Sequence, residues 1–294
     1  MKRIAIIGAG SFLARNFIKY CIDNKKNYTF ELYDHVNRKD FPQFPFKIID
    51  FKELKSIKTI NFNVDIIMIF IGKTGTTNGF DLYQQFIEVN EIMLLSLLQV
   101  YNEANSKACI IYPSSRLIFK SNEKEKIRED SPKECKSIYA ITKLAAEEYL
   151  HLYHDVYGLP YIILRICTPI GSLLEDFGNY GTFEIFKNQA LERKEITVFG
   201  DGKQKKTFTS MNDICKAFSL IIDKGVTEFA DYNLGGQELQ LIDIAKTIAK
   251  EYNVKIKHIV WPTIYKKVDG GSVVFDSTRF DNEFSMEYEK LIMN

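Results

Sequence analysis

A tyrosine and a lysine four positions apart are the residues of this sequence best suited to chemistry. Tyr139 and Lys143 lie in a stretch that predicts a helix over residues 137–157, which stacks their side chains on one face. A free tyrosine has a pKa of about 10, and a fixed positive charge nearby favours the phenolate. The pair can therefore act as acid and base at neutral pH. Ser115 follows the end of a predicted strand and can hydrogen-bond the same reacting oxygen.

The helix that carries this pair ends clearly, because Gly158 suits a left-handed C-terminal position and Pro160 forbids continuation. Upstream, β-branched runs alternate with segments of helical periodicity. Strands are predicted over Arg3–Ile7, Phe30–Tyr33, Lys47–Ile49, Asp65–Ile71, Ala108–Tyr112 and Tyr161–Ile166, and further helices over Phe12–Ile22 and Phe80–Asn105. Six strands in this order predict an α/β fold with a Rossmann-type doubly wound parallel sheet.

The pattern becomes less regular after Thr168, where glycines mark frequent turns. We therefore expect a dinucleotide-binding Rossmann domain over residues 1–167, to which the chain returns near residues 205–224. A smaller C-terminal mixed α/β lobe that binds the substrate is expected over residues 168–294.

A glycine-rich turn follows the first predicted strand. Gly8 and Gly10 lead into a helix whose free amides and positive dipole end can hold a pyrophosphate. Asp34, at the end of the second strand, can accept both adenosine ribose hydroxyls and would repel a 2′-phosphate, which favours NAD. Arg38 can instead bind such a phosphate, so NADP stays an alternative.

Composition and charge narrow the function classes further. The chain has 294 residues and a formal net charge of +1, which gives no electrostatic reason to expect nucleic acid or an anionic membrane as a partner. The five cysteines are scattered and show no paired spacing, so we expect no disulfide framework and no metal site. No apolar run is long enough to span a bilayer. These features predict a cytoplasmic protein.

Several motifs resemble those of the extended short-chain dehydrogenase/reductases, specifically the NAD-dependent epimerase/dehydratase family that acts on nucleotide sugars. The resemblance covers nearly the whole chain. It rests on Tyr112–Phe119 (YPSSRLIF), Tyr139–Tyr149 (YAITKLAAEEY), Leu164-Arg165 with Pro169-Ile170-Gly171, Gly200–Gln204, and Asn212-Asp213. Of these, Gly200–Gln204 and Asn212-Asp213 resemble the family's segment that meets the nucleotide diphosphate.

The resemblance implies a role for each matching position. Ser115 would be the catalytic hydroxyl, Tyr139 the proton carrier, and Lys143 both the tuner of Tyr139 and a contact to the nicotinamide ribose. The cofactor would be held by Gly8, Gly10, Ser11, Phe12, Leu13, Asp34, Asp50, Phe51, Phe70, Ile71, Gly72, Asn90, Tyr139, Lys143 and Cys167. Substrate contacts would come from Ser115, Arg116, Thr168, Asn179 and Lys206. The family also implies a homodimer and a role in polysaccharide biosynthesis.

Three reactions use this machinery. A 4,6-dehydratase is disfavoured, because Arg116-Leu117 stand where those enzymes carry an added acid and base. We favour a NAD-dependent nucleotide-sugar epimerase, in which a hydride leaves a sugar carbon, C4 by preference, and returns to its opposite face. The alternative is an NAD(P)H-dependent keto-sugar reductase, which the altered glycine turn favours, since Ser11 and Ala14 replace family glycines. A non-catalytic dinucleotide sensor is a further possibility, which the intact Ser115, Tyr139 and Lys143 disfavour.

Overall fold

The computed structural model describes residues 1–36, 38–175, 181–193, 195–225, 229–269 and 271–291. By its internal contacts the chain divides into two compact units. The first contains Met1–Ser115, Ser137–Leu164 and Phe218–Tyr232, and the second contains Arg116–Lys136, Arg165–Ala217 and Asn233–Asn294. The predicted domain division after residue 167 stays a prediction.

A seven-stranded sheet forms the centre of the first unit, in the order β10-β6-β5-β4-β1-β2-β3. Its strands are β1 (Lys2–Ile7), β2 (Tyr28–Asp34), β3 (Phe46–Ile48), β4 (Ile66–Ile69), β5 (Cys109–Ser115), β6 (Tyr161–Ile166) and β10 (Ala230–Asn233). Strand β1 pairs in parallel with both β2 and β4. The β2–β3 and β4–β5 pairs are also parallel. The predicted Rossmann-type fold is confirmed. The seventh strand, β10, was not predicted, because its four residues carry no distinct pattern.

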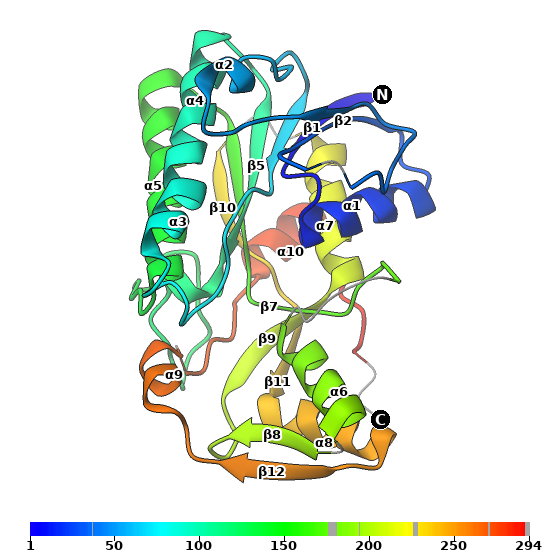
Figure 1. Cartoon of the computed structure of the whole chain (residues 1–294), viewed down its shortest axis with the longest axis vertical. Helices are drawn as coiled ribbons and strands as arrows, with labels where there is room; N and C mark the ends of the chain where they lie inside the picture. Colours follow the sequence, from blue (N-terminus) through cyan, green and yellow to red (C-terminus); the bar gives the residue numbers. More distant parts are fainter. Residues whose placement is uncertain (37, 176–180, 194, 226–228, 270, 292–294) are drawn as a thin grey trace. The chain divides into compact units, whose positions relative to one another are not determined.

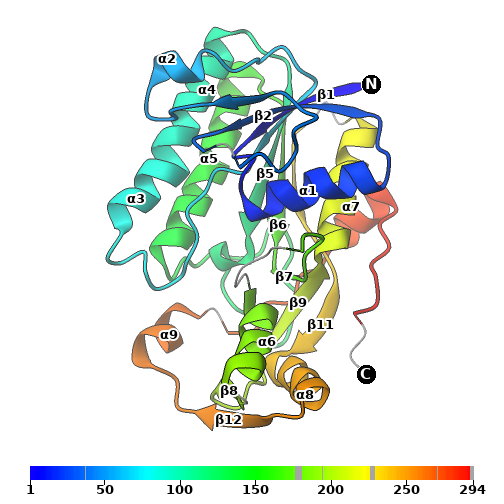
Figure 2. The same ribbon diagram turned by 45° about the vertical axis from the view of Figure 1, so that its right-hand side comes forward.

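Helices cover both faces of this sheet, as Figures 1 and 2 show. On one face, α4 (Met93–Glu103) and α5 (Ile138–Tyr157) contribute leucines to a core that contains Ala5 and Ile7 of β1. On the other face, Phe17 of α1 (Phe12–Asp23) packs edge-on against Phe30 of β2 and Phe218 of α7 (Met211–Lys224). Alternate residues of each strand face opposite layers, which explains the continuous burial of β4 and β5.

The stretch predicted as one helix over residues 80–105 is three connected segments. It comprises α3 (Tyr83–Ile87), a π-helical turn over Glu88–Ile92, and α4. Such turns recur at functional sites because they change the direction of a side chain within a helix. The predicted ends of α5 agree with the structure: Ser137 caps its start, and Gly158 is left-handed at its end, with φ of 70°.

The second unit is a mixed α/β assembly with a core of its own. A three-stranded sheet has the order β11-β9-β7, and β8 pairs in parallel with β12. Its strands are β7 (Thr168–Ile170), β8 (Glu195–Phe199), β9 (Lys205–Ser210), β11 (Gln237–Gln240) and β12 (Lys255–Ile259). Its helical segments are the 3₁₀ turn η2 (Arg116–Ile118), α6 (Gly181–Arg193), α8 (Leu241–Tyr252), α9 (Thr263–Val268) and α10 (Thr278–Phe284). The short helix α2 (Leu54–Ile57) belongs to the first unit. Across the described residues, no helix has the length and apolarity that a membrane span requires.

Candidate active site

The turn between β1 and α1 brings two stretches of backbone close together. Gly8 is left-handed, with φ of +85°, and a Cβ built on it would lie 2.7 Å from the Ile71 nitrogen and 2.8 Å from the Phe70 carbonyl carbon. Only glycine fits this position without a shift of the backbone. Ser11 then caps α1, where its Oγ accepts a hydrogen bond from the Ala14 nitrogen at 3.3 Å. The turn thus presents a helix N-terminus suited to an anion.

Asp34 ends β2 and fastens it to the same turn. Its Oδ2 accepts a hydrogen bond from the Gly10 nitrogen at 2.7 Å, and its Oδ1 accepts one from the His35 nitrogen at 2.6 Å. A Cβ on Gly10 would lie 3.1 Å from that Oδ2 and 3.3 Å from side-chain atoms of Arg38. The carboxylate that favours NAD and the guanidinium that favours NADP therefore lie beside one glycine.

A cleft of about 760 Å³ lies at the carboxyl ends of β1 to β4, within the size range of ligand pockets. The predicted cofactor residues that line it are Gly8, Gly10, Ser11, Asp34, Asp50, Phe51, Phe70, Ile71 and Gly72. Arg38 also lines it, together with residues that the sequence analysis missed, namely His35, Val36, Ile48, Ile49, Lys52, Glu88, Val89 and Met93. The first five of these missed residues are near strand ends and could have been found there. The last three belong to the π-helical turn and α4, which only the packing brings to the cleft.

Asn90, a predicted cofactor residue, lies in the π-helical turn and is 3% exposed. Its Oδ1 accepts a hydrogen bond from the Lys73 nitrogen at 2.7 Å, and its Nδ2 donates to the Lys73 carbonyl at 3.0 Å and to Thr142 Oγ1 at 2.9 Å. Asn90 thus ties the loop after β4 to α5 one residue before Lys143. Phe12 and Leu13 begin α1 beside the glycine-rich turn, outside the residues that line the cleft.

The three predicted catalytic residues belong to two neighbouring elements of the first unit. Ser115 is the last residue of β5, and Tyr139 and Lys143 lie on α5. A Cβ built on Gly72 would lie 3.8 Å from the Lys143 Nζ, and Gly72 lines the cleft. The lysine ammonium therefore lies at the Gly72 end of the cleft. The Tyr139 ring packs edge-on against Phe86 of α3, with 6.5 Å between ring centroids.

Tyr112 of β5 holds Lys143 in place and was missed from the sequence. The Lys143 Nζ donates hydrogen bonds to the Tyr112 hydroxyl at 3.0 Å and to the Pro113 carbonyl at 2.9 Å. It also lies 4.3 Å from the centroid of the Tyr112 ring, at cation–π distance. Burial lowers the pKa of Lys143 to about 8, whereas the charge of Glu147 acts to raise it. Burial raises the pKa of Tyr112 well above its ordinary value, so its hydroxyl stays protonated.

Removing the Tyr112 hydroxyl should weaken cofactor binding. In Tyr112→Phe the ammonium loses one acceptor, and a hydrogen bond to a charged group is worth roughly 1.5–3 kcal/mol, so we expect a roughly tenfold or larger loss of dinucleotide affinity in a calorimetric titration. Tyr101→Phe is the matched control, because the Tyr101 hydroxyl is also buried but donates to the Ala108 carbonyl at 2.9 Å, away from Lys143. Equal affinities in the two variants would contradict the role of Tyr112.

The second unit contains the other predicted ligand contacts. Arg116 begins η2, and Lys206 lies on β9, whose Phe208 is paired with Thr168 of β7. Cys167, predicted to contact the cofactor, also lies in this unit, and its Sγ donates to the Val273 carbonyl at 3.4 Å. Burial raises the pKa of this thiol, so it stays protonated at neutral pH. The predicted substrate contact Asn179 lies outside the described residues.

The two buried lysines predict a distinctive pH dependence of stability. Burial lowers the pKa of both Lys143 and Lys206 from 10.5 to about 8, so above pH 8 the unfolded chain binds more protons than the folded chain. The free energy of unfolding of the ligand-free protein should therefore rise from pH 8 to 9, by up to about 1.4 kcal/mol per pH unit for each lysine. Buried thiols such as Cys21 and Cys109, whose pKa values burial raises above the ordinary value of 9.0, act in the opposite direction and reduce this rise as the pH approaches 9, because they ionise only in the unfolded chain. Urea denaturation across the window checks this, and Lys143→Met should show a smaller slope.

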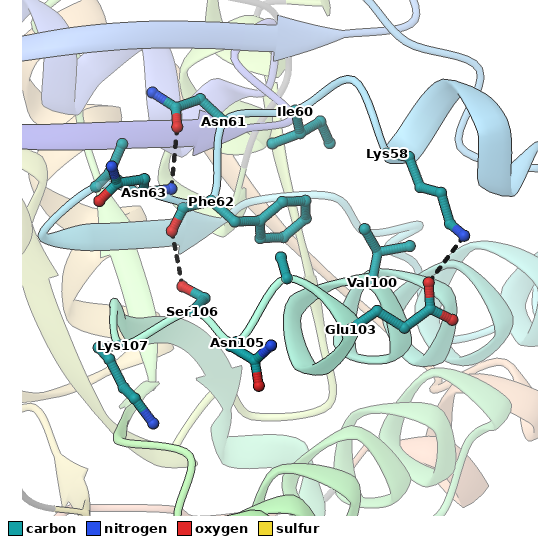
Figure 3. Close-up of a pocket in the computed structure, with 12 residues that line it drawn as sticks. Lys58, Ile60, Asn61, Phe62, Asn63, Val100, Glu103, Asn105, Ser106 and Lys107 are labelled. Carbon is teal, nitrogen blue, oxygen red and sulfur yellow. Dashed lines mark hydrogen bonds and ion pairs between the residues drawn. The ribbon is translucent and has the colours of Figure 1, made fainter.

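A second hollow, of about 600 Å³, lies next to the amino ends of β4 and β5, at the end of these strands opposite to the cleft (Figure 3). Several of the polar groups shown there pair with each other: Lys58 with Glu103 at 2.9 Å, Ser106 Oγ with the Phe62 carbonyl at 2.7 Å, and the Asn63 nitrogen with Asn61 Oδ1 at 2.9 Å. In doubly wound sheets ligands bind at the carboxyl ends of the strands. The cleft of Gly8 and Asp34 is therefore the candidate site.

Comparison with known proteins places this geometry in context. The model of the "NAD dependent epimerase/dehydratase family" matches residues 4–235. A putative UDP-glucose 4-epimerase of Methanocaldococcus jannaschii is 23% identical over 219 residues, which are 73% of this chain and 71% of that protein. The family match therefore spans the glycine-rich turn, the cleft and the Tyr139–Lys143 pair.

Two solved structures share the fold. The UDP-glucose 4-epimerase of Thermus thermophilus, in complex with NAD, has a TM-score of 0.85 and 18% identity, with 99% of this chain and 95% of that chain covered. The UDP-glucuronic acid 4-epimerase of Bacillus cereus, in complex with UDP-glucuronic acid and NAD, has a TM-score of 0.84 and 19% identity, with the same coverage. At these identities the similarity shows the fold alone.

Proposed function

Since the chain belongs to the NAD-dependent epimerase/dehydratase family, we propose that it is a NAD-dependent epimerase of a nucleotide-linked sugar, with C4 as the reacting carbon. The position of Lys143 is the observation that carries this proposal. Its ammonium lies at the Gly72 end of the cleft, beside Gly72 itself. In the proposed reaction the nicotinamide of the dinucleotide lies at that end, next to Lys143. The UDP-sugar 4-epimerases among the relatives and structural neighbours support a UDP-linked hexose as substrate.

The residues of the cleft fit NAD, the cofactor on which the family depends. Gly8 and Gly10 carry no side chain that would keep a pyrophosphate away from the backbone of the turn. A Cβ on Gly8 would overlap the backbone of Phe70 and Ile71, and one on Gly10 would lie 3.1 Å from Asp34 Oδ2. Asp34 lies at the end of β2, where its carboxylate would accept the adenosine ribose hydroxyls. When bound, NAD supplies the acceptor and donor of the hydride.

The chain's own residues handle the proton. Tyr139 takes the proton of the C4 hydroxyl as the hydride leaves C4, and gives it back after the keto-sugar has presented its other face. The positive charge of Lys143 favours the phenolate of Tyr139, and Ser115 hydrogen-bonds the reacting oxygen. In this proposal the first unit is the dinucleotide-binding domain, and the second contributes Arg116, Thr168, Asn179 and Lys206 to the substrate.

A keto-sugar reductase is the second candidate. The N-terminus of α1 favours this reaction. Ser11 stands there at a position where the family has glycine, and its side chain caps the helix. A cofactor that approaches this turn less closely exchanges more readily. A 4,6-dehydratase stays disfavoured, because Arg116 and Leu117 supply no acid and base after Ser115. Cytoplasmic location and polysaccharide biosynthesis stay predictions.

The first test is to purify the protein without added nucleotide, denature it, and identify the released dinucleotide by mass spectrometry. An epimerase recycles its own hydride, so we expect NAD in near-stoichiometric amount. A protein that releases none and then binds NADH or NADPH would favour the reductase. Preference for NADPH would also show that Arg38, rather than Asp34, decides cofactor choice.

We also propose the homodimer that the resemblance implies. Apolar side chains are exposed on the helices that cover one face of the sheet: Tyr83 and Ile87 on α3, Ile92 on the π-helical turn, and Leu152 and Val156 on α5. Exposed apolar residues that cluster on neighbouring helices are typical of an interaction surface, and α3 and α5 are in contact.

Light scattering should accordingly give about twice the calculated mass of 34.1 kDa at micromolar concentration. Leu152→Glu should give the monomer mass, because Leu152 is 56% exposed on α5 and a second copy would bury it. Ile264→Glu is the matched control, since Ile264 is 45% exposed on α9 of the second unit. A wild-type monomer would refute the dimer.

A further inference from the structure

An ion pair links two walls of the cleft in the first unit. Lys52 lies in the segment after β3, and its Nζ is 2.8 Å from the Oε1 of Glu88, the first residue of the π-helical turn. Both residues line the cleft, although they are far apart in the sequence. Their side chains are 59% and 42% exposed, so the pair lies at the rim of the cleft and not at its floor.

The backbone on both sides of this pair is held by hydrogen bonds. Asp50 Oδ1 accepts one from the Lys52 nitrogen at 3.0 Å, and the Asp50 nitrogen donates one to Ser56 Oγ at 2.9 Å. On the other wall, the amide of Asn90 fixes the π-helical turn to the backbone of Lys73. The pair can therefore open by rotation of two exposed side chains, with no movement of either wall.

The pair lies toward the end of the cleft that is opposite to Lys143. In the sheet, β3 follows β2 on the side away from β4, whereas Lys143 lies beside Gly72 after β4. If Asp34 at the end of β2 accepts the ribose hydroxyls, the adenine lies beyond it, toward β3. The cleft is lined there by apolar residues next to the pair, namely Ile48 and Phe51 on one wall and Val89 on the other. Apolar walls suit the flat ring of a base.

We propose that Lys52 and Glu88 form a gate over the adenine end of the cleft, which the dinucleotide must open to enter and to leave. This inference rests on the proposed binding of NAD in the cleft. The gate closes behind the cofactor as well as in front of it, so it slows entry and release by the same factor and leaves the equilibrium affinity unchanged. Slow release suits an epimerase, because its cofactor stays bound through the whole reaction.

Stopped-flow fluorescence with NADH tests the gate without requiring turnover. Mixing the protein with NADH gives the association rate constant, and chasing NADH-loaded protein with excess NAD gives the release rate constant. Lys52→Met and Glu88→Gln should each raise both rate constants roughly 1.5- to 5-fold, the range expected for an exposed ion pair, with Kd unchanged within about twofold. The double variant should be no faster than either single variant, because each substitution breaks the same pair.

Glu103→Gln is the matched control. Glu103 of α4 forms an ion pair of the same kind with Lys58 at the end of α2, with 2.9 Å between Nζ and Oε2 and side chains that are 44% and 54% exposed (Figure 3). This pair lies at the second hollow, away from the cleft. Its loss should leave both rate constants of NADH unchanged.

Three results would overturn the gate. If Lys52→Met raises Kd as much as it raises the release rate constant, the lysine binds the cofactor itself. If the effects of the two single substitutions multiply in the double variant, the two side chains act separately. Unchanged rate constants in all the variants would overturn the gate and leave the epimerase proposal standing, whereas a wild type that binds neither NADH nor NAD would refute the cofactor on which both proposals rest.

Discussion

Tyr139→Phe should lower kcat by about 10²- to 10⁴-fold, the usual contribution of a positioned acid or base. The substitution removes the phenolic hydroxyl and with it the transferable proton, while a phenylalanine ring keeps the edge-on packing against Phe86 of α3. The hydrogen bonds of Lys143 go to Tyr112 and Pro113, so the ammonium stays in place. NAD affinity and the free energy of unfolding should therefore stay close to those of the wild type. Steady-state kinetics with a UDP-sugar, together with a NAD titration, measures both effects.

Tyr157→Phe provides the control on the same helix. Tyr157 is the last residue of α5 and is 56% exposed, so loss of its hydroxyl should leave turnover unchanged. Wild-type turnover in Tyr139→Phe would refute the assignment of Tyr139 as the proton carrier. A loss of NAD affinity as large as the loss of kcat would show that the phenol positions the cofactor.

Gly8→Ala should abolish measurable NAD binding and lower stability. The new methyl group would lie 2.7 Å from the Ile71 nitrogen and 2.8 Å from the Phe70 carbonyl carbon, so the end of β4 must move. Because Phe70, Ile71 and Gly72 line the cleft, that movement distorts the cofactor site. The left-handed φ of +85° adds a strain of about 1–2 kcal/mol for any residue with a side chain. Calorimetry with NAD and urea denaturation measure the two consequences.

Gly158→Ala separates backbone strain from steric overlap. Gly158 is also left-handed, with φ of +70°, but no atom lies within 4 Å of its built Cβ. It should lose about 1 kcal/mol of stability, as expected when a helix loses its C-terminal glycine, and retain NAD affinity. If Gly8→Ala behaves like Gly158→Ala, the close approach of the turn to β4 does not matter for the cofactor.

The sequence alone determined the features that depend on neighbouring residues. The strand, glycine-rich turn and helix over residues 2–23 were all predicted, because side-chain periodicity and left-handed glycines act within a few residues. The same holds for α5, whose boundaries at Ser137 and Gly158 are set by local caps. A parallel Rossmann-type sheet follows from the alternation of such elements.

The tertiary structure decided what touches the candidate site. Tyr112 and Lys143 are 31 positions apart and meet only because α5 packs against β5. The break of the predicted long helix at Glu88–Ile92 places Asn90 against Lys73 and Thr142, which no local pattern indicates. Periodicity tells which face of an element is buried and leaves open which partner that face meets. Partners, burial and pKa values depend on contacts between distant segments, so the burial of the Lys143 ammonium and its lowered pKa emerged only from the folded chain.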